Sequence, residues 1–337
     1  MHSGIHHTLD FEADGKQSGI LSVPVSVDRS PYFHVQVPVL VVRNGEGPRI
    51  LLMAGNHGDE YEGEFCLARL MRRLDPALLR GTVTILPLAN APAVRAGKRC
   101  SPIDGGNLNR AFPGDPRGSA TSRIAHALEH DLFPRHEVVF DLHSGGTSMA
   151  HLPCALIESQ DDAARQARAL DLMGSLGLPF GFVAENGRDA PTTMGAARRA
   201  GIVGISGEFG GGGTTTPATM RAAGRAIDAL LIRLGAIAGP LLAAESQPPA
   251  LPMRILALSR HSQSVYATRG GWFEPAVELG ARVAPGDLAG WYHDLERLEA
   301  PEEPLRFAEG GIVISHRLHS HAMAGDCLMQ VAEPVLL

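Results

Sequence analysis

Cysteine, long apolar runs and basic clusters are all scarce in this sequence, and each scarcity argues against a class of protein. The cysteines lack CxxC spacing in a chain too large to need disulfides, so we expect reduced thiols. No apolar stretch is long enough to span a bilayer, and the first residues lack the basic start and apolar segment of a secretory leader. No basic run or face stands out. We therefore expect a cytoplasmic protein without a membrane or nucleic-acid partner. The four cysteines are Cys66, Cys100, Cys154 and Cys327.

What is present is the composition of an ordinary globular protein. Hydrophobic residues make up 44% of the 337 residues and charged residues 20%, with a net charge of −6. Such a chain can bury a sizeable core, either as two domains or as one large α/β domain with an appendage. The 15 histidines raise the expectation of metal or acid/base chemistry only slightly.

Apolar runs alternate with segments of helical periodicity over the first two thirds of the chain. Runs that are apolar throughout are typical of strands covered on both faces, and strands that alternate with helices predict a largely parallel sheet. We therefore expect an α/β fold, with a mostly parallel mixed sheet and helices on both faces. The expected strands are 37–43, 49–54, 82–88, 138–142, 180–184 and 202–206, and the expected helices are about 65–74, 119–133, 161–176 and 217–234.

The last third of the chain has a different character. Proline and small residues at 238–252 predict a linker, and short β-like pieces with glycine and proline turns follow it. We expect a catalytic domain over 1–240 and a small all-β domain, barrel-like, over 250–337. Two similar turns, at Gly286-Asp287 and Gly325-Asp326, suggest a pair of related hairpins as in a lipoyl-type barrel. This segment contains no lysine, which excludes a lipoyl or biotinyl carrier, so we expect a scaffold or a lid.

Three of the expected strands end next to side chains that bind metals. The run 49–54 leads into GNHGDEYEGE, which contains His57 and Glu60; the run 138–142 leads to His143, and 202–206 leads to Glu208. If these strands are neighbours in one parallel sheet, their carboxyl ends bring all four side chains together. Catalytic zinc commonly takes two histidines and one carboxylate, which matches the first three residues.

Glu208 is then left over as a general base. Zinc lowers the pKa of a bound water to about 7, so a nearby glutamate can accept its proton and later return it to a leaving amine. Each residue taken alone also has a simpler explanation: His57 as a turn residue, Glu60 as a carboxylate favoured at a helix N-terminus, and His143 as a capped strand end. Asp141 either orients a ligand histidine or is a buried, hydrogen-bonded aspartate.

A long irregular segment supplies a candidate for substrate binding. It contains NLNRAFPG at 107–114, in which Asn109 and Arg110 are suited to hold a carboxylate through charge-assisted hydrogen bonds. The segment lies in the long loop that follows the expected strand 82–88. We expect a substrate with a carboxylate group.

The motifs GNHGDE, NLNRAFPG, DLHSGG and GEFGGGG occur in this order, and together they resemble the succinylglutamate desuccinylase/aspartoacylase family, a branch of the zinc carboxypeptidase fold. The similarity spans roughly residues 35 to 235. It implies that His57, Glu60 and His143 bind one zinc ion per chain and that Glu208 is the general base and acid. It also implies that Asn109 and Arg110 recognise a carboxylate.

The family also uses an arginine upstream of the LNR motif to polarise the scissile carbonyl. Arg99, within KRCSPIDGG, is the best match, with Lys98 and Arg95 nearby, and a surface arginine in a loop is the alternative. RCSPIDGGNLNRAFPGD together with DLHSGG resembles a subgroup that contains the N-α-acetyl-L-2,4-diaminobutyrate deacetylases of ectoine breakdown. The reaction implied is hydrolysis of an N-acyl amino acid.

Other histidine clusters compete with this interpretation. His126, Glu129 and His130 fit the H-x-x-E-H zinc motif, but the apolar stripe of their helix places both histidines on the opposite face, so we expect a solvated surface. A further group near the C-terminus has no acidic partner at ligand spacing, and we expect it on an exposed strand face. It consists of His316, His319 and His321.

Two other enzyme classes are disfavoured. GEFGGGGTTT lacks the Gly-Lys-Ser/Thr ending of a phosphate-binding loop, and its glycines more plausibly let the backbone bend so that Glu208 faces the metal. No G-x-S-x-G occurs, which argues against a serine hydrolase. We expect a zinc-dependent deacylase of small N-acyl amino acids, as a monomer or a homo-oligomer. A succinylglutamate desuccinylase, an aspartoacylase, a peptidase that trims C-terminal residues, and a binding module without turnover are the alternatives.

Overall fold

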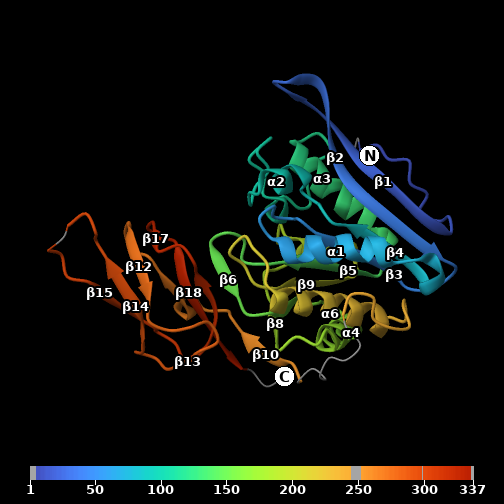
Figure 1. The fold of residues 1–337 in the computed structure, drawn as a ribbon. Helices are drawn as coiled ribbons and strands as arrows, with labels where there is room; N and C mark the ends of the chain where they lie inside the picture. The colour runs from blue at the N-terminus through green and yellow to red at the C-terminus, as the bar shows by residue number, and fades with distance from the viewer. Residues whose placement is uncertain (1–4, 244–251, 298, 335–337) are drawn as a thin grey trace.

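The computed structural model describes residues 5–243, 252–297 and 299–334. Figure 1 shows an α/β body built from the first two thirds of the chain, with the strands of the last third beside it. The expected α/β class and the all-β character of the C-terminal part are confirmed. Part of the expected linker, 244–251, lies outside the described residues.

Four strands form the centre of the body, in the order β4-β3-β5-β9, and all of them run parallel. All residues of β4 and β5 are buried, and so are all residues of β3 except Arg49, as the apolar runs predict. The strands are β3 (Arg49–Ala54), β4 (Gly81–Leu86), β5 (Val138–His143) and β9 (Val203–Glu208).

Alternate residues of these strands pack into two separate cores, one on each face of the sheet. Ile50 and Leu52 face the core formed with α1 (Tyr61–Arg73), α4 (Ala163–Ser175) and α6 (Pro217–Arg233). Leu51 and Met53 face the core formed with α2 (Ala91–Ala96), α3 (Ala120–Ala127) and α5 (Thr193–Ala200). Burying both faces is why most residues of these strands are apolar.

Antiparallel strands flank this centre on both sides. At one edge, β1 (Gly15–Val27) and β2 (Ser30–Asn44) form a long hairpin that joins the sheet through β4. At the other, β7 (Cys154–Glu158) runs antiparallel to β9 and parallel to β8 (Phe180–Ala184). Because β7 is reversed, residues near its C-terminal end lie toward the amino ends of the central strands.

The C-terminal strands continue the large sheet and also build a second one. β10 (Arg254–Ala257) pairs with β8 and with β18 (Cys327–Pro334), so within the described residues the large sheet has 14 strands. The second sheet has the order β15-β14-β12-β17. Its strands are β12 (Gly271–Pro275), β14 (Leu288–His293), β15 (Glu303–Arg306) and β17 (His321–Ala322).

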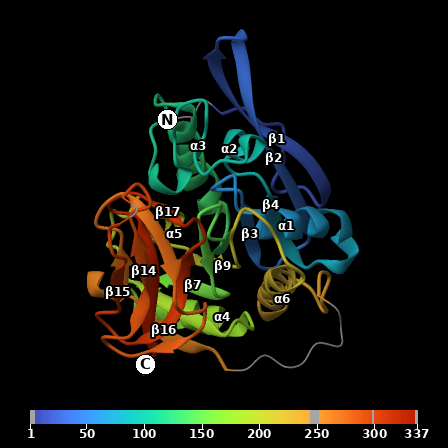
Figure 2. The ribbon, with the colours of Figure 1, turned by 60° about the vertical axis from the view of Figure 1, so that its left-hand side comes forward.

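The C-terminal part touches the catalytic edge of the body through β6 (Met149–His151), which pairs with β16 (Gly311–Arg317). Figure 1 shows β6 on the side of the body that faces the C-terminal strands, and Figure 2 shows β16 among those strands. The two predicted turns are alike, because Asp287 and Asp326 each accept a hydrogen bond from the backbone three residues earlier. The remaining short pieces are β11 (Ser264–Tyr266), β13 (Arg282–Val283), η1 (Pro76–Leu78), η2 (Leu108–Arg110) and η5 (His261–Gln263).

The expected helix over 119–133 is corrected. α3 ends at Ala127, a π-helical turn η3 (Leu128–Leu132) follows, and η4 (Phe133–Arg135) is a 3-10 turn. Pro134 lacks the backbone N–H that a continued α-helix needs, which explains why the segment changes its winding before the next strand. No helix of the described residues is both long and apolar enough to cross a membrane.

Candidate active site

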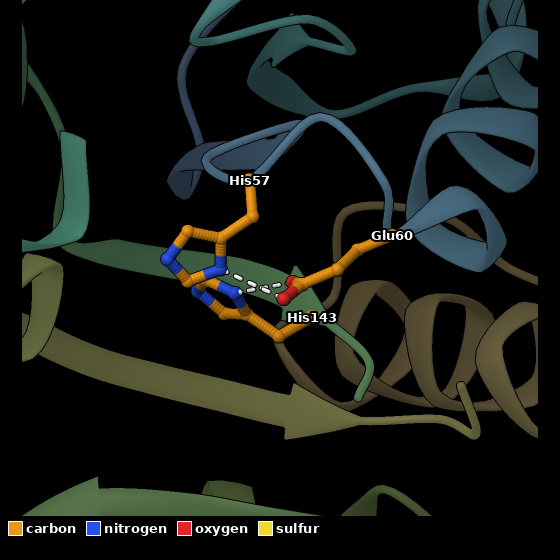
Figure 3. Close-up of side chains that lie close together, drawn as sticks. All are labelled: His57, Glu60 and His143. Atoms are coloured by element: carbon orange, nitrogen blue, oxygen red, sulfur yellow. Dashed lines mark hydrogen bonds and ion pairs between the residues drawn. The ribbon is translucent and has the colours of Figure 1, made fainter. Parts of the chain in front are cut away.

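Three side chains from the carboxyl edge of the sheet converge in one buried cluster. His57 and Glu60 stand on the loop between β3 and α1, where Glu60 is the residue that precedes the helix, and His143 ends β5. One ligand atom from each of the three lies within 4.8 Å of the other two. Figure 3 shows both imidazoles directed at the Glu60 carboxylate, with Nδ1 of His57 at 2.7 Å and Nδ1 of His143 at 2.8 Å.

Glycine lets the loop pass close enough to position these side chains. A Cβ atom at Gly58 would lie 2.0 Å from the carbonyl carbon of Ala93, and at Gly55, where φ is 71°, a side chain would also be strained. The loop therefore packs directly against α2, and His57 and Glu60 are held on either side of this contact.

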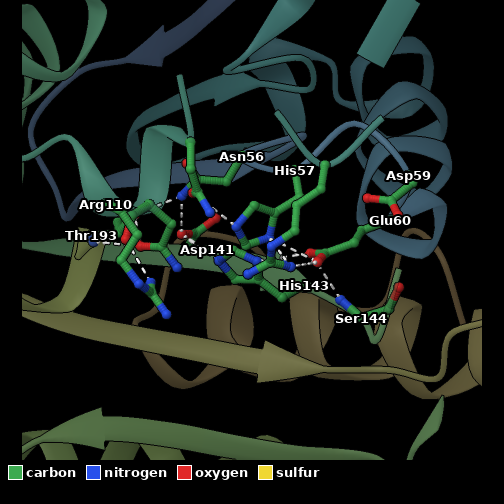
Figure 4. A network of polar contacts seen from close by, with 12 residues as sticks. Asn56, His57, Asp59, Glu60, Arg110, Asp141, His143, Ser144 and Thr193 are labelled. Carbon is green, nitrogen blue, oxygen red and sulfur yellow. Dashed lines mark hydrogen bonds and ion pairs between the residues drawn. The ribbon is translucent and has the colours of Figure 1, made fainter. Parts of the chain in front are cut away.

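A second layer of hydrogen bonds orients both imidazoles. Nε2 of His143 lies 2.8 Å from Oδ2 of Asp141, an oxygen that also accepts a hydrogen bond from Asn56, and Nε2 of His57 lies 3.2 Å from Oδ1 of Asn107. With Nε2 engaged on both rings, Nδ1 is left to point inward. Both roles predicted for Asp141 are therefore confirmed. It is a fully buried, hydrogen-bonded aspartate, and it orients the candidate ligand His143 (Figure 4).

The electrostatics of the cluster suit a cation. Burial acts to raise the pKa of Glu60, but the two imidazoles hold it well below its usual range. Burial lowers the pKa of His57, which favours the neutral imidazole that metals bind. For His143, burial is outweighed by the Asp141 and Glu60 carboxylates, which raise the pKa of this ring. Two nitrogen donors and one carboxylate in a buried site are the donor set of a divalent metal, and these residues can hold one.

Glu208 lies next to the cluster because β5 and β9 are paired so that His143 is opposite Glu208. Burial raises the pKa of Glu208 to about 8, with a further contribution from the nearby Glu60 charge. Its Oε2 atom is buried without a hydrogen-bond partner. A carboxyl group that is close to the cluster, has one oxygen without a partner and has its pKa raised toward neutral pH can accept and release a proton.

Arg99 also reaches the cluster. Its Nη1 atom lies 3.4 Å from Oε1 of Glu60 and 3.4 Å from Nδ1 of His57, while the side chain remains 49% exposed. Arg95 points elsewhere, since its guanidinium donates to the backbone carbonyl of Gln36. Of the basic side chains near KRCSPIDGG, Arg99 is the one that contacts the predicted metal ligands.

Asn109 and Arg110 lie on η2, at the mouth of a cavity of about 150 Å³ that His143 and Glu208 also line. Oδ1 of Asn109 accepts a hydrogen bond from the backbone N–H of Thr193 at 2.9 Å, which fixes the amide. The exposed Arg110 donates only to the carbonyl of Asn109 among the described residues and forms no ion pair with a carboxylate there. Its guanidinium is therefore available to an anionic ligand.

The side chains of the competing H-x-x-E-H motif, at 126–130, contact other residues instead of forming a metal site. Glu129 is buried and forms a two-pronged ion pair with Arg199, at 2.8 Å from each nitrogen, and the rings of His126 and His130 stack on each other. The expected solvated surface is thus right for the exposed His130, only partly right for the half-buried His126, and wrong for the buried Glu129. His319 and His321 are exposed, and within the described residues only the His57 cluster has metal-binding geometry.

The glycine run after Glu208 is explained by a close approach of two backbones. A Cβ atom at Gly211 would lie 1.9 Å from the carbonyl oxygen of Met149, and φ at this glycine is 148°. Ala150 and Gly211 form an isolated bridge, so the run holds β6 against the end of β9.

Several residues of the site were missed by sequence analysis. Asn56 and Asn107 lie inside the motifs GNHGDE and NLNRAFPG, but nothing in the sequence alone shows that they orient other side chains. Thr193 and Glu158 come from elements that were not expected at all. For Glu158 the one available signal was an acidic residue that closes the apolar run CALI.

The cluster at the carboxyl edge of this mixed sheet has the donor set of catalytic metal sites. The family model described as the succinylglutamate desuccinylase/aspartoacylase catalytic domain matches residues 46–234. An N-alpha-acetyl-L-2,4-diaminobutyric acid deacetylase from Halomonas elongata is 40% identical over 334 residues, which cover 99% of this chain and 96% of that protein. The chain belongs to the succinylglutamate desuccinylase/aspartoacylase family, as its motifs predict, and is an amide hydrolase.

Solved structures give the same result. A succinylglutamate desuccinylase/aspartoacylase from Rhodobacter sphaeroides has a TM-score of 0.91 and 34% identity, with 98% of this chain and 100% of that chain covered. The product-bound ectoine utilization protein EutE (DoeB) from Ruegeria pomeroyi has a TM-score of 0.92 and 33% identity, with 99% and 100% covered. The similarity extends over the C-terminal strands as well as the α/β body.

Proposed function

We propose that this protein removes the acyl group from a small N-acyl amino acid, with N-α-acetyl-L-2,4-diaminobutyrate as the preferred substrate, and that His57, Glu60 and His143 hold one zinc ion. The observation that carries the proposal is the His57 cluster with Glu208 beside it, whose Oε2 atom has no hydrogen-bond partner, next to a small cavity that His143 and Glu208 line. The similarity to the Halomonas elongata deacetylase over almost its whole length supports this substrate.

Each protein group has a role in this reaction. When bound, zinc supplies Lewis acidity, which makes a water molecule acidic near neutral pH and polarises an amide carbonyl. Glu208 accepts the proton of the attacking water and returns it to the leaving amine, for which a pKa of about 8 is suitable. Arg99 stabilises the negative charge that develops on the carbonyl oxygen. Asn109 and Arg110 hold the substrate carboxylate.

The C-terminal strands have a proposed role as a scaffold at the site. We assign catalysis to residues 1–240 and this supporting role to residues 250–337. The pairing of β16 with β6 supports the assignment, since β6 also lies against the glycine run that follows Glu208. Such a cover admits small substrates better than long peptides, which disfavours a peptidase.

The test is amine release from N-acetyl, N-succinyl and N-formyl amino acids by wild type, by Glu208→Gln and by a control, Glu46→Gln, in which the changed residue is exposed. We expect Glu208→Gln to lower kcat by about 10²- to 10⁴-fold, because the proton acceptor is lost, and to keep its metal. Glu46→Gln should match wild type.

Two results would contradict the proposal. Full turnover by Glu208→Gln would show that Glu208 is not the general base. Ligand binding without turnover by wild type would indicate a binding module. If wild type preferred N-succinylglutamate or N-acetylaspartate over the acetylated diamino acid, the deacylase function would stand but the proposed substrate would be wrong.

A further inference from the structure

The cavity at the active site extends along the face of the sheet to a second, unexplained carboxylate. Glu158 is the last residue of β7, is 1% exposed, and lines the same 150 Å³ cavity as Arg110 and Glu208. Cys154, at the start of β7, is opposite Glu208, so Glu158 lies four residues further along the strand. At about 3.3 Å per residue the two positions are about 13 Å apart along the strand, which places Glu158 well away from the reacting groups.

Glu158 forms no ion pair in the described part of the chain, and the nearby Arg198 is paired with Asp161 instead. Its carboxylate accepts two hydrogen bonds from Asn186, one from the backbone N–H at 2.6 Å and one from the side-chain amide at 3.2 Å. The ion pairs of the described residues do not include it. Buried carboxylates are normally neutralised by a cation, because removing an unpaired charge from water is costly. A cationic group of a ligand in the cavity would provide this neutralisation.

The rest of the cavity fits an amino acid with a short cationic side chain. Arg110, an exposed residue that lines the cavity, carries a guanidinium that no carboxylate of the described residues neutralises. Apart from the catalytic Glu208, the cavity therefore offers a positive group in Arg110 and a negative group in Glu158. The half-buried Leu156 and Met194 line the same cavity and suit the methylene groups of a side chain. Carboxylate, apolar stem and ammonium follow one another in this order in a diamino acid.

We propose that Glu158 is a specificity-determining residue that binds the side-chain ammonium of the N-acyl amino acid, and that it excludes substrates with acidic side chains. This inference rests on the proposed deacylase function. It names the group that selects a diamino acid from the other small amino acids that would fit. The Glu158 carboxylate would repel the side-chain carboxylate of an N-acylated aspartate or glutamate.

The alternative is a structural role, in which Glu158 only holds the loop that begins at Asn186. Glu158→Gln separates the two roles, since the glutamine oxygen can still accept from the backbone N–H of Asn186 while the charge is lost. Glu185→Gln is the matched control, because Glu185 is an exposed glutamate at the same end of the sheet and does not line the cavity.

The experiment compares kcat/KM for N-α-acetyl-L-2,4-diaminobutyrate with that for N-acetyl-L-norvaline, in which a methyl group replaces the ammonium. Wild type and Glu185→Gln should prefer the diamino substrate. In Glu158→Gln we expect this preference to fall by about 10- to 100-fold, the range for loss of a charged hydrogen bond. Turnover of N-acetyl-L-norvaline should stay within about threefold of wild type, which also shows that the variant is folded.

Binding of the free amino acids, measured by calorimetry on the metal-loaded protein, separates this inference from the proposed function. L-2,4-diaminobutyrate should bind wild type more tightly than L-norvaline, and Glu158→Gln should lose this difference. If that holds while wild type hydrolyses neither substrate, the inference stands and the deacylase function fails. If hydrolysis occurs but Glu158→Gln keeps the wild-type preference, or loses both substrates equally, the inference is overturned.

Discussion

Two regions of this molecule each combine two histidines with one glutamate, and only one of them has metal-binding geometry. The catalytic cluster, His57, Glu60 and His143, draws its residues from two strand ends. The helical cluster, His126, Glu129 and His130, lies on consecutive turns of α3 and η3 and even fits a zinc motif in sequence. Spacing along the chain therefore does not decide which set can bind a metal.

The difference lies in what else the carboxylates contact. Both oxygens of Glu60 face imidazole nitrogens at 2.7 and 2.8 Å, and the nearest arginine, Arg99, stays at 3.4 Å. Glu129 is instead neutralised by Arg199, and Nδ1 of His130 lies 3.1 Å from the carbonyl of His126. A carboxylate that is already paired with a partly buried arginine would have to give up that pair to bind a metal.

The largest expected effect comes from removing one ligand in each cluster. We expect His57→Ala to lose the bound metal and with it nearly all turnover, because two protein ligands rarely retain a catalytic zinc ion. His130→Ala should keep both, since this ring is exposed and belongs to the cluster with a paired glutamate. Metal content by mass spectrometry and amine release would be measured on both variants. If the two variants had equal metal content and equal turnover, the conclusion that only the catalytic cluster binds the metal would be wrong.

A smaller effect is expected from the residue that orients His143. Asp141→Asn keeps the size of the side chain but removes the charge that accepts from Nε2 of His143. We expect zinc affinity to fall by about 10- to 100-fold, the usual range for such supporting residues. Competition with a chromophoric chelator would measure it, and Asp131→Asn, an exposed change near the helical cluster, is the control. Unchanged affinity in Asp141→Asn would show that Asp141 is only a buried hydrogen-bonded residue.

The smallest effect is expected in the helical cluster and concerns stability alone. Glu129→Gln breaks the ion pair with Arg199, whose side chain is 21% exposed, so water screens part of the loss. We expect the free energy of unfolding to fall by about 2 kcal/mol, within the range for a charged hydrogen bond, with metal content and turnover unchanged. Urea unfolding followed by circular dichroism would measure it. Loss of metal from this variant would contradict the structural role assigned to Glu129.

Much of the fold was predictable because the central strands are buried on both faces. The expected ranges 49–54 and 180–184 coincide with β3 and β8, since in each case an apolar run ends where polar or turn residues begin. The hairpin of β1 and β2 was mostly missed, because one side of an edge hairpin faces water and its pattern mixes polar with apolar residues. α5 was missed as well, since eight residues are too few for a clear helical period.

Sequence by itself determined the chemistry that is possible: the four motifs with their histidines, carboxylates and arginines, and the parallel strands whose ends carry them. Only the tertiary structure decided which of these groups meet. Adjacent pairing of β3, β5 and β9 brings His57, Glu60, His143 and Glu208 together, and the reversed strand β7 carries Glu158 into the same cavity. The physical reason is that strand order and direction depend on how all the apolar faces pack at once, which no single segment specifies.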